Sequence, residues 1–343
     1  MLSEVELPIS REGTFSQGTP EPVLASAAVA HGRVYFASVD TLYCLGEKTA
    51  RREPPSQPAA LPKGEGPAAY LLVRSTELVL KPGELVQLHA LAYDAQGRLL
   101  GEVPAQWSAS GLEGSLAESK FTTATANRGQ TGLITAQAAG GVKGIARARI
   151  TPLPPYREDF AALEPGKVAP QWISGTTGKF QVQALEGAKV LAKFPDETIF
   201  RRMRVFFGPN DLHDYLMEAD VRATERRRQM GDAGIFVQRY GLILYANTQR
   251  LELVPWQPET TRTVSVPFEI RKDTWYRLKL RVDNLPGSAV RIRAKAWPRA
   301  AAEPADWMID KTDPFGNREG SPGLFGDAQF GLFYDNVKVT ANQ

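Results

Sequence analysis

Alternation of apolar and charged residues along short segments is the feature that most constrains this chain. In "WYRLKLRV" (residues 275–282), the apolar residues Tyr276, Leu278, Leu280 and Val282 occupy every second position. Successive side chains of a strand point to opposite faces, so the pattern predicts a strand with one buried and one wet face. Similar runs recur along the chain between Gly, Pro, Asn and Asp residues, and none has a sustained helical period. The sequence therefore predicts an all-β protein.

Two proline-rich breaks divide the chain. The run "EPPSQPAALPKGEGP" (residues 53–67) carries five prolines, and "TPLPPY" (residues 151–156) follows an alternating strand. Proline fixes φ and has no amide hydrogen, so such a run forbids a helix or a central strand and favours an extended spacer. We expect segments at 1–50, 68–151 and 156–343, with a linker at 51–67.

Composition excludes several kinds of protein. The 343 residues are 43% hydrophobic and 23% charged with a net charge of +3, which is ordinary for a folded protein and gives no basic bias toward nucleic acid. No apolar run approaches the roughly 20 residues of a membrane span. The N-terminal residues show no secretion signal. Cys44 is the single cysteine, so no intramolecular disulfide is expected, and its apolar flanks predict a small core residue.

The first segment contains a short set of strands. In "SAAVAHGRVYFASVDTLYCLG" (residues 26–46), "RVYFAS" and "TLYCLG" alternate on either side of a Val39–Asp40 step. The segment resembles one blade of a quinoprotein-like (PQQ-like) β-propeller. The resemblance implies a longer protein whose other blades lie upstream, because each blade buries its faces only against its neighbours. We expect a blade remnant at residues 1–50, without the quinone chemistry of a complete ring.

The middle segment reads as a sandwich. "LVLKPGELVQLHALAYDAQGRLL" (residues 78–100) places Val86, Leu88, Ala90 and Ala92 at period two between two turns, and "VPAQWSAS" and "GLITAQAAGGVKGIARARIT" follow. This order resembles bacterial immunoglobulin-like domains over residues 68–151. The resemblance implies that Trp107 fills the sandwich core.

The last segment is the longest. Strand-like runs include "KFQVQAL", "YLMEADVRA", "AGIFVQRYGLILYAN" and "FGLFYDNVKVT". Their number and length predict a two-sheet jelly roll. Together with "YREDF" at its start and "GLFYDNVKV" at its end, the segment 156–343 resembles the concanavalin/laminin-G-like group, which includes sugar-binding modules.

Aromatic residues of this segment are the candidate ligand-binding residues. An aromatic face suits the apolar face of a pyranose, so Tyr240, Trp256 and Trp172, with Arg239 beside them, predict a site for a polysaccharide. The alternative for each ring is a place in the core, where sandwich tryptophans more often lie.

One candidate metal site joins the two ends of the segment. In lectin-like jelly rolls a structural calcium ion often joins the first and last strands, and here Glu158, Asp159 and Asp335 occupy those positions. Calcium takes six to eight oxygen ligands, so these carboxylates are a fragment of a site. The alternative is that Asp335 closes a turn or binds the neighbouring strand.

Enzyme signatures are weak. Glycoside hydrolysis needs two carboxylates in a cleft, and the only pair on one predicted strand is Glu218 and Asp220, which also fits a solvated strand face. The three histidines are scattered, and no GxSxG motif, phosphate loop or GxGxxG motif is present. The expectation is that the chain is not an enzyme, with a glycan hydrolase or lyase of dispersed carboxylates as the alternative.

Two basic clusters are candidate nucleic-acid sites. Arg201, Arg202 and Arg204 form the first, and residues 226–228 form the second. A nucleic-acid site would interleave such charges with exposed aromatic residues in a basic domain, so a solvated face is the prediction, with an anionic polysaccharide as the other partner.

Taken together, these features predict a modular carbohydrate-binding or adhesion protein. The family resemblances place it in the periplasm or outside the cell, and a purely structural spacer is the third alternative. Neither the sugar nor the oligomeric state follows from the sequence.

Overall fold

The computed structural model describes residues 6–9, 20–23, 25–38, 41–46, 62–175, 178–194, 202–256 and 258–342. These residues are built from strands, and their helical segments are the single 3-10 turns η1 (Ala139–Gly141) and η3 (Ala246–Thr248). The all-β prediction is confirmed. By their internal contacts the residues fall into two compact units, Met1–Pro62 with Gln257–Thr261 and Lys63–Trp256 with Arg262–Gln343. No helix in the described part of the chain is long and apolar enough to cross a membrane.

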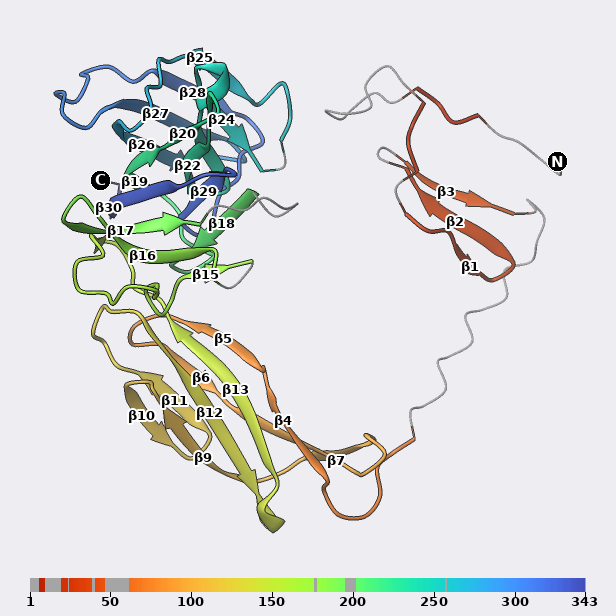
Figure 1. The fold of residues 1–343 in the computed structure, drawn as a ribbon. Coiled ribbons are helices and arrows are strands. Elements are labelled where there is room, and N and C mark those ends of the chain that lie inside the picture. The colour runs from red at the N-terminus through yellow and green to blue at the C-terminus, as the bar shows by residue number, and fades with distance from the viewer. Residues whose placement is uncertain are drawn as a thin grey trace. The chain divides into compact units, whose positions relative to one another are not determined.

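The first unit holds one small antiparallel sheet (Figure 1), with the order β1 (Ala28–Ala30), β2 (Arg33–Ala37), β3 (Leu42–Leu45). The Phe36 and Tyr43 rings stack across β2 and β3 with their centroids 5.0 Å apart. The nearly buried Glu21 carboxylate accepts hydrogen bonds from the Tyr43 hydroxyl at 2.9 Å and from Ser38. Cys44 is exposed, which corrects its predicted place in a core. The reason is that β1 and most of β3 are exposed to solvent, so this sheet has no buried apolar face for Cys44 to join.

Three sheets form the middle sandwich, which we define as residues 68–151. Their orders are β5-β13-β12-β9, β4-β7-β8 and β10-β11-β6. The strands are β4 (Tyr70–Arg74), β5 (Glu77–Leu80), β6 (Leu85–Gln87), β7 (His89–Tyr93), β8 (Leu99–Glu102), β9 (Ala105–Ser110), β10 (Gly114–Ala117), β11 (Lys120–Thr123), β12 (Gln130–Ala138) and β13 (Lys143–Ile150). They enclose a core of their own, against which Trp107 packs while remaining half-buried.

The alternation predicted for residues 86–92 is present, but it spans two strands. Leu88, Ala90 and Ala92 are buried as expected. The chain changes sheets at Leu88, because β6 pairs with β11 whereas β7 pairs with β4. One buried face therefore continues across a corner of the sandwich.

Two large sheets form the jelly roll, residues 156–342, as predicted. The eight-stranded sheet has the order β16-β17-β30-β19-β26-β27-β28, with β14 paired to β30. Its strands are β14 (Tyr156–Glu158), β16 (Phe180–Leu185), β17 (Ala188–Lys193), β19 (Tyr215–Ala223), β26 (Trp275–Asn284), β27 (Val290–Pro298), β28 (Ile309–Asp313) and β30 (Leu332–Ala341).

The seven-stranded sheet has the order β15-β18-β29-β22-β23-β24-β25. Its strands are β15 (Ile173–Ser174), β18 (Arg202–Phe206), β22 (Asp232–Val237), β23 (Tyr240–Tyr245), β24 (Arg250–Pro255), β25 (Val264–Pro267) and β29 (Gly323–Asp327). A short hairpin, β20 (Glu225–Arg226) and β21 (Gln229–Met230), leads into β22. The strands β22 to β25 follow one another as an antiparallel meander.

The main core of the jelly roll lies between the two sheets, and each sheet contributes the side chains of one face to it. On β26, Tyr276, Leu278, Leu280 and Val282 are buried, and the alternate residues point outward as their polarity predicts. The side chains of these two sheets that can contact a ligand therefore lie on the outer faces.

Candidate functional site

A second, smaller apolar cluster lies on the outer face of the seven-stranded sheet. Phe236, Ile243 and Phe325 form it, with Tyr245 and Val254 at its margin. A methyl group added at Gly241, the cross-strand partner of Phe236, would stand 2.9 Å from that ring. Glycine at this position therefore leaves room for the ring to lie on the sheet.

One guanidinium group, that of Arg204, contacts three aromatic rings of this face. The Arg204 Cζ lies 4.5 Å from the Trp256 ring centroid, 5.6 Å from that of Phe236 and 5.7 Å from that of Phe325. Arg204 comes from β18 and Trp256 follows β24, so the two side chains meet across three intervening strands. Burial lowers the pKa of Arg204, with the neighbouring Arg202 charge acting in the same direction. The stacking of a guanidinium on an aromatic face offsets part of this desolvation cost.

Two rings of this face remain open to solvent. Trp256 is 46% exposed although Arg204 covers part of it, and Phe206, which packs on Phe236 at 5.7 Å, is 36% exposed. We name the outer surface formed by Arg204, Phe206, Phe236, Phe325 and Trp256 the Trp256 face. A half-exposed indole held by a cation is a flat apolar surface fixed in place.

The backbone of Arg239 lies next to that of Trp256. The turn Gln238–Arg239 joins β22 to β23 with both residues at positive φ, 46° and 64°. The Arg239 carbonyl accepts a hydrogen bond from the Trp256 amide at 2.8 Å. The Arg239 side chain is exposed, and its Nε donates to the Glu319 carbonyl at 3.0 Å.

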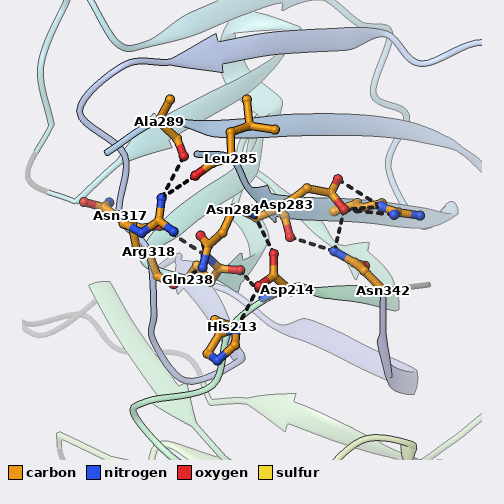
Figure 2. Close-up of polar contacts among 12 residues, drawn as sticks. His213, Asp214, Gln238, Asp283, Asn284, Leu285, Ala289, Asn317, Arg318 and Asn342 are labelled. Carbon is orange, nitrogen blue, oxygen red and sulfur yellow. Dashed lines mark hydrogen bonds and ion pairs between the residues drawn. The ribbon is translucent and has the colours of Figure 1, made fainter. Parts of the chain in front are cut away.

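A polar network fixes the backbone that carries these two residues (Figure 2). The buried Gln238 side chain accepts a hydrogen bond from the Asp214 amide and donates to Asn284 and to the Asn317 carbonyl. The Asn317 side-chain amide in turn donates to the carbonyls of Arg239 at 3.2 Å and Trp256 at 3.1 Å. Buried amides with satisfied partners hold a single geometry, so the turn and the indole backbone are held together.

Tyr240 is a core residue in the structure. Its ring is 1% exposed, and its hydroxyl donates to Asp313 at 2.6 Å and accepts from the Asn317 amide at 3.0 Å. Burial raises the pKa of Tyr240 to about 12. Tyr240 shares its side of β23 with the buried Leu242 and Leu244, so it offers no ring face to a sugar.

Trp172 is also a core residue. It is 4% exposed and stacks on Phe207 with ring centroids 4.3 Å apart. The Phe160 ring meets it edge-on at 5.6 Å, and its Nε1 donates to the Tyr156 hydroxyl at 3.0 Å. The ring is thus enclosed by aromatic neighbours, which corrects its place among the ligand-binding candidates.

The three predicted calcium ligands do not form a cation site. Among the described residues, no group of three or more His, Cys, Asp and Glu side chains is arranged to hold a metal ion. The Glu158 carboxylate accepts from the Phe160 amide and that of Asp159 from the Ala161 amide, while Asp335 accepts from the Asn336 amide. Each carboxylate is turned to its own local backbone, so their oxygens do not converge on one point.

Two carboxylates that no sequence motif marks lie opposite each other on the seven-stranded sheet. Asp232 of β22 pairs with Asp327 of β29, and Arg202 of β18 lies opposite Asp327 on its other side. The Arg202 Nε is 2.8 Å from the Asp327 Oδ2, and the Asp232 Oδ1 accepts from the Ala246 amide at 2.9 Å. Burial raises the pKa of Asp232 to about 6, and the Asp327 charge adds to that rise. Only the strand register brings these residues together.

The residues of the two predicted basic clusters have different neighbours. Arg202 pairs with Asp327 and Arg204 belongs to the Trp256 face, while Arg201 lies outside the described residues. Arg226 and Arg227 line a cavity of about 430 Å³ together with Gln229, Gln329 and Phe330.

Comparisons with known proteins identify no family. No protein-family model matches the sequence, and no curated protein matches it. Among solved structures, a Bacillus subtilis protein of unknown function with a galectin-like fold is 11% identical, covering 55% of this chain and 100% of that one with a TM-score of 0.33. An alginate lyase in complex with an alginate trisaccharide is 12% identical, covering 50% and 88% with a TM-score of 0.36. Carbohydrate-binding modules of the β-sandwich superfamily are 10% identical, covering 81% and 99% with a TM-score of 0.20.

Proposed function

We propose that the jelly roll is a carbohydrate-binding module that holds a polysaccharide against the Trp256 face. The observation that carries this proposal is the half-exposed Trp256 indole, held by the Arg204 guanidinium on the same face as the exposed Phe206. An indole face covers the apolar C–H face of a pyranose, and the exposed side chain of Arg239, whose backbone neighbours that of Trp256, can donate to sugar hydroxyl groups. A polymer running along the open sheet face would meet both groups.

The wider architecture belongs to the same proposal. We interpret the sheet β1–β3 as a remnant of a quinoprotein-like blade and the middle sandwich as an immunoglobulin-like spacer that presents the jelly roll. Such a modular protein would work in the periplasm or outside the cell, where polysaccharides are met.

Affinity electrophoresis in gels containing polysaccharides tests the binding proposal. Truncation of a tryptophan anchor typically costs roughly 2 kcal/mol or more, about thirtyfold in affinity, so Trp256→Ala should lose retention. The matched control is Tyr70→Ala, which removes a ring that is 60% exposed in the middle sandwich. Equal retention of both variants would overturn the proposal, and no retention of the folded wild type in any gel would favour the structural spacer.

A second function, glycan hydrolysis, is favoured by the Asp232–Asp327 pair. The register puts the two side chains on the same face of the sheet as direct cross-strand neighbours, and retaining glycosidases use a pair of neighbouring carboxyl groups about 5–5.5 Å apart. In this function Asp232, whose pKa is raised by burial, would protonate the glycosidic oxygen, and Asp327 would leave its ion pair with Arg202 to attack the anomeric carbon before water releases the sugar. Release of reducing ends from a retained polysaccharide, lost in Asp232→Asn, would establish this function. Retention in the gel without release of reducing ends would support binding without hydrolysis.

A further inference from the structure

A cavity of about 410 Å³ lies on the outer face of the eight-stranded sheet, away from the Trp256 face. We name it the Arg157 pocket; it is lined by Arg157, Glu158, Asp159, Glu218, Arg277, Asn336, Val337 and Lys338. Its volume lies within the roughly 300–1,000 Å³ of small-molecule sites. Its lining is almost entirely polar, since Val337 is the one apolar member and is itself 1% exposed.

The floor of this pocket is held rigidly by a buried carboxylate. Asp220 is fully buried and accepts two hydrogen bonds from Arg277, Nε to Oδ1 at 2.7 Å and Nη2 to Oδ2 at 2.9 Å. The Asn336 side-chain amide donates to Asp220 at 2.8 Å and to Asp335 at 3.1 Å. A bidentate pair of this kind fixes the guanidinium plane, so Arg277 and Asn336 are positioned before any ligand arrives.

A β-bulge shapes the same place. The register of β19 against β30 shifts between Glu218 and Asp220, and Asn336 takes a positive φ of 50°. Bulges redirect side chains and recur next to binding sites. Here the bulge allows Asn336 to reach the carboxylate of Asp220 while Lys338 stays opposite Glu218, 3.5 Å from it.

The charges of the lining select the ligand class. Three cationic side chains, Arg157, Arg277 and Lys338, are matched by three carboxylates, those of Glu158, Asp159 and Glu218. The carboxylates would repel an anionic ligand, and the guanidinium groups would repel a cationic one. An apolar ligand finds no exposed apolar wall. An uncharged polyhydroxylated ring satisfies both sets, because each hydroxyl group can donate to a carboxylate or to the Asn336 side-chain oxygen and accept from an arginine or lysine.

Arg157 is the group available to such a ligand. Within the described residues, no hydrogen bond or ion pair holds its exposed side chain, although it lies beside Lys338 in the register of β14 and β30. We infer that the Arg157 pocket is a second sugar site, which takes a single uncharged sugar ring and uses residues distinct from those of the Trp256 face. This inference deepens the proposed carbohydrate role but is tested separately from it.

The test is a titration of the full chain with glucose, galactose, glucuronate and glucosamine, followed by NMR of the Asn336 side-chain amide. We expect a neutral sugar to shift this resonance, and Arg157→Ala to weaken the binding about tenfold by removing a charge-assisted hydrogen bond. Trp256→Ala should leave the affinity for the neutral sugar unchanged. Arg291→Ala is the matched control, because Arg291 is an exposed arginine of the same sheet that lies outside the pocket lining.

Three results would overturn the inference. They are an Asn336 amide unmoved by any of the four sugars, tighter binding of glucuronate or glucosamine than of the neutral sugars, and wild-type affinity in Arg157→Ala. Because polysaccharide retention in gels and the titration of single sugars at Asn336 are separate measurements, failure of either site is distinguishable from failure of the other.

Discussion

On the outer face of the seven-stranded sheet, rings from β22, β29 and the end of β24 pack around one guanidinium group. The outer face of the eight-stranded sheet has its own small apolar cluster around Phe333, but around the Arg157 pocket it carries a network of ion pairs, among them Arg277 with Asp220 and Lys279 with Glu218 at 2.9 Å. Both faces come from strands that bury every second residue in one shared core. The difference shows that alternation decides which residues face outward, while the chemistry of the outward set decides what a face can bind.

The largest expected effect concerns Asp220, which anchors the ion pairs. Asp220→Asn keeps the shape but removes the charge that pairs with Arg277, and breaking a buried ion pair costs about 3 kcal/mol or more. The free energy of unfolding from urea titration should fall by about this amount. A change below about 1 kcal/mol would contradict the claim that a buried, rigidly held ion pair distinguishes the outer face of the eight-stranded sheet.

An intermediate effect concerns Asp232 on the other sheet. Its folded pKa of about 6 lies above the ordinary carboxyl value, so the folded state favours the protonated form. The corresponding stability is fully present below about pH 4 and is lost as the pH rises through about 6. Asp232→Asn retains an acceptor for the Ala246 amide and should stabilise the fold by about 1–2 kcal/mol at pH 7, after allowance for partial exposure.

Unfolding of wild type and Asp232→Asn at several pH values between 4 and 7 measures this effect. The two proteins should converge toward pH 4 and diverge toward pH 7. A variant that is less stable than the wild type at pH 7 would contradict the assigned burial of the charge.

The smallest expected effect concerns Arg291, which pairs with Asp310 at 2.6 Å where both side chains are well exposed. Exposed pairs contribute about 0–1 kcal/mol and weaken with salt. Arg291→Ala should therefore change the unfolding free energy little, and not at all in high salt. A loss as large as that of Asp220→Asn would remove the distinction between buried and exposed pairs of this face.

Strands were predictable from the sequence because alternation is a local signal. The run 275–282 became part of β26 with the expected residues buried. The two-residue period of a strand also predicts that Tyr240 is internal, because Tyr240, Leu242 and Leu244 occupy every second position of β23. Trp172 gave no such signal, because it lies outside the strands and its environment is made by Phe160 and Phe207.

The sites themselves depend on register between distant strands. Arg204 meets Trp256 only because β18 and β24 belong to one sheet, and Asp232 faces Asp327 only because β22 pairs with β29. No spacing within the sequence encodes these pairings. The calcium prediction failed for a related reason, since strand ends near one another do not specify where their carboxylates point.

The most direct test of the carbohydrate role is the indole Nε1–H resonance of Trp256, assigned by its disappearance in Trp256→Phe and followed while a retained polysaccharide or its oligosaccharides are titrated. The Trp256 resonance should shift progressively and saturate, with the resonance of the buried Trp172 unmoved as an internal reference. A polysaccharide that binds without moving the Trp256 resonance would contradict the proposal that this face is the binding site.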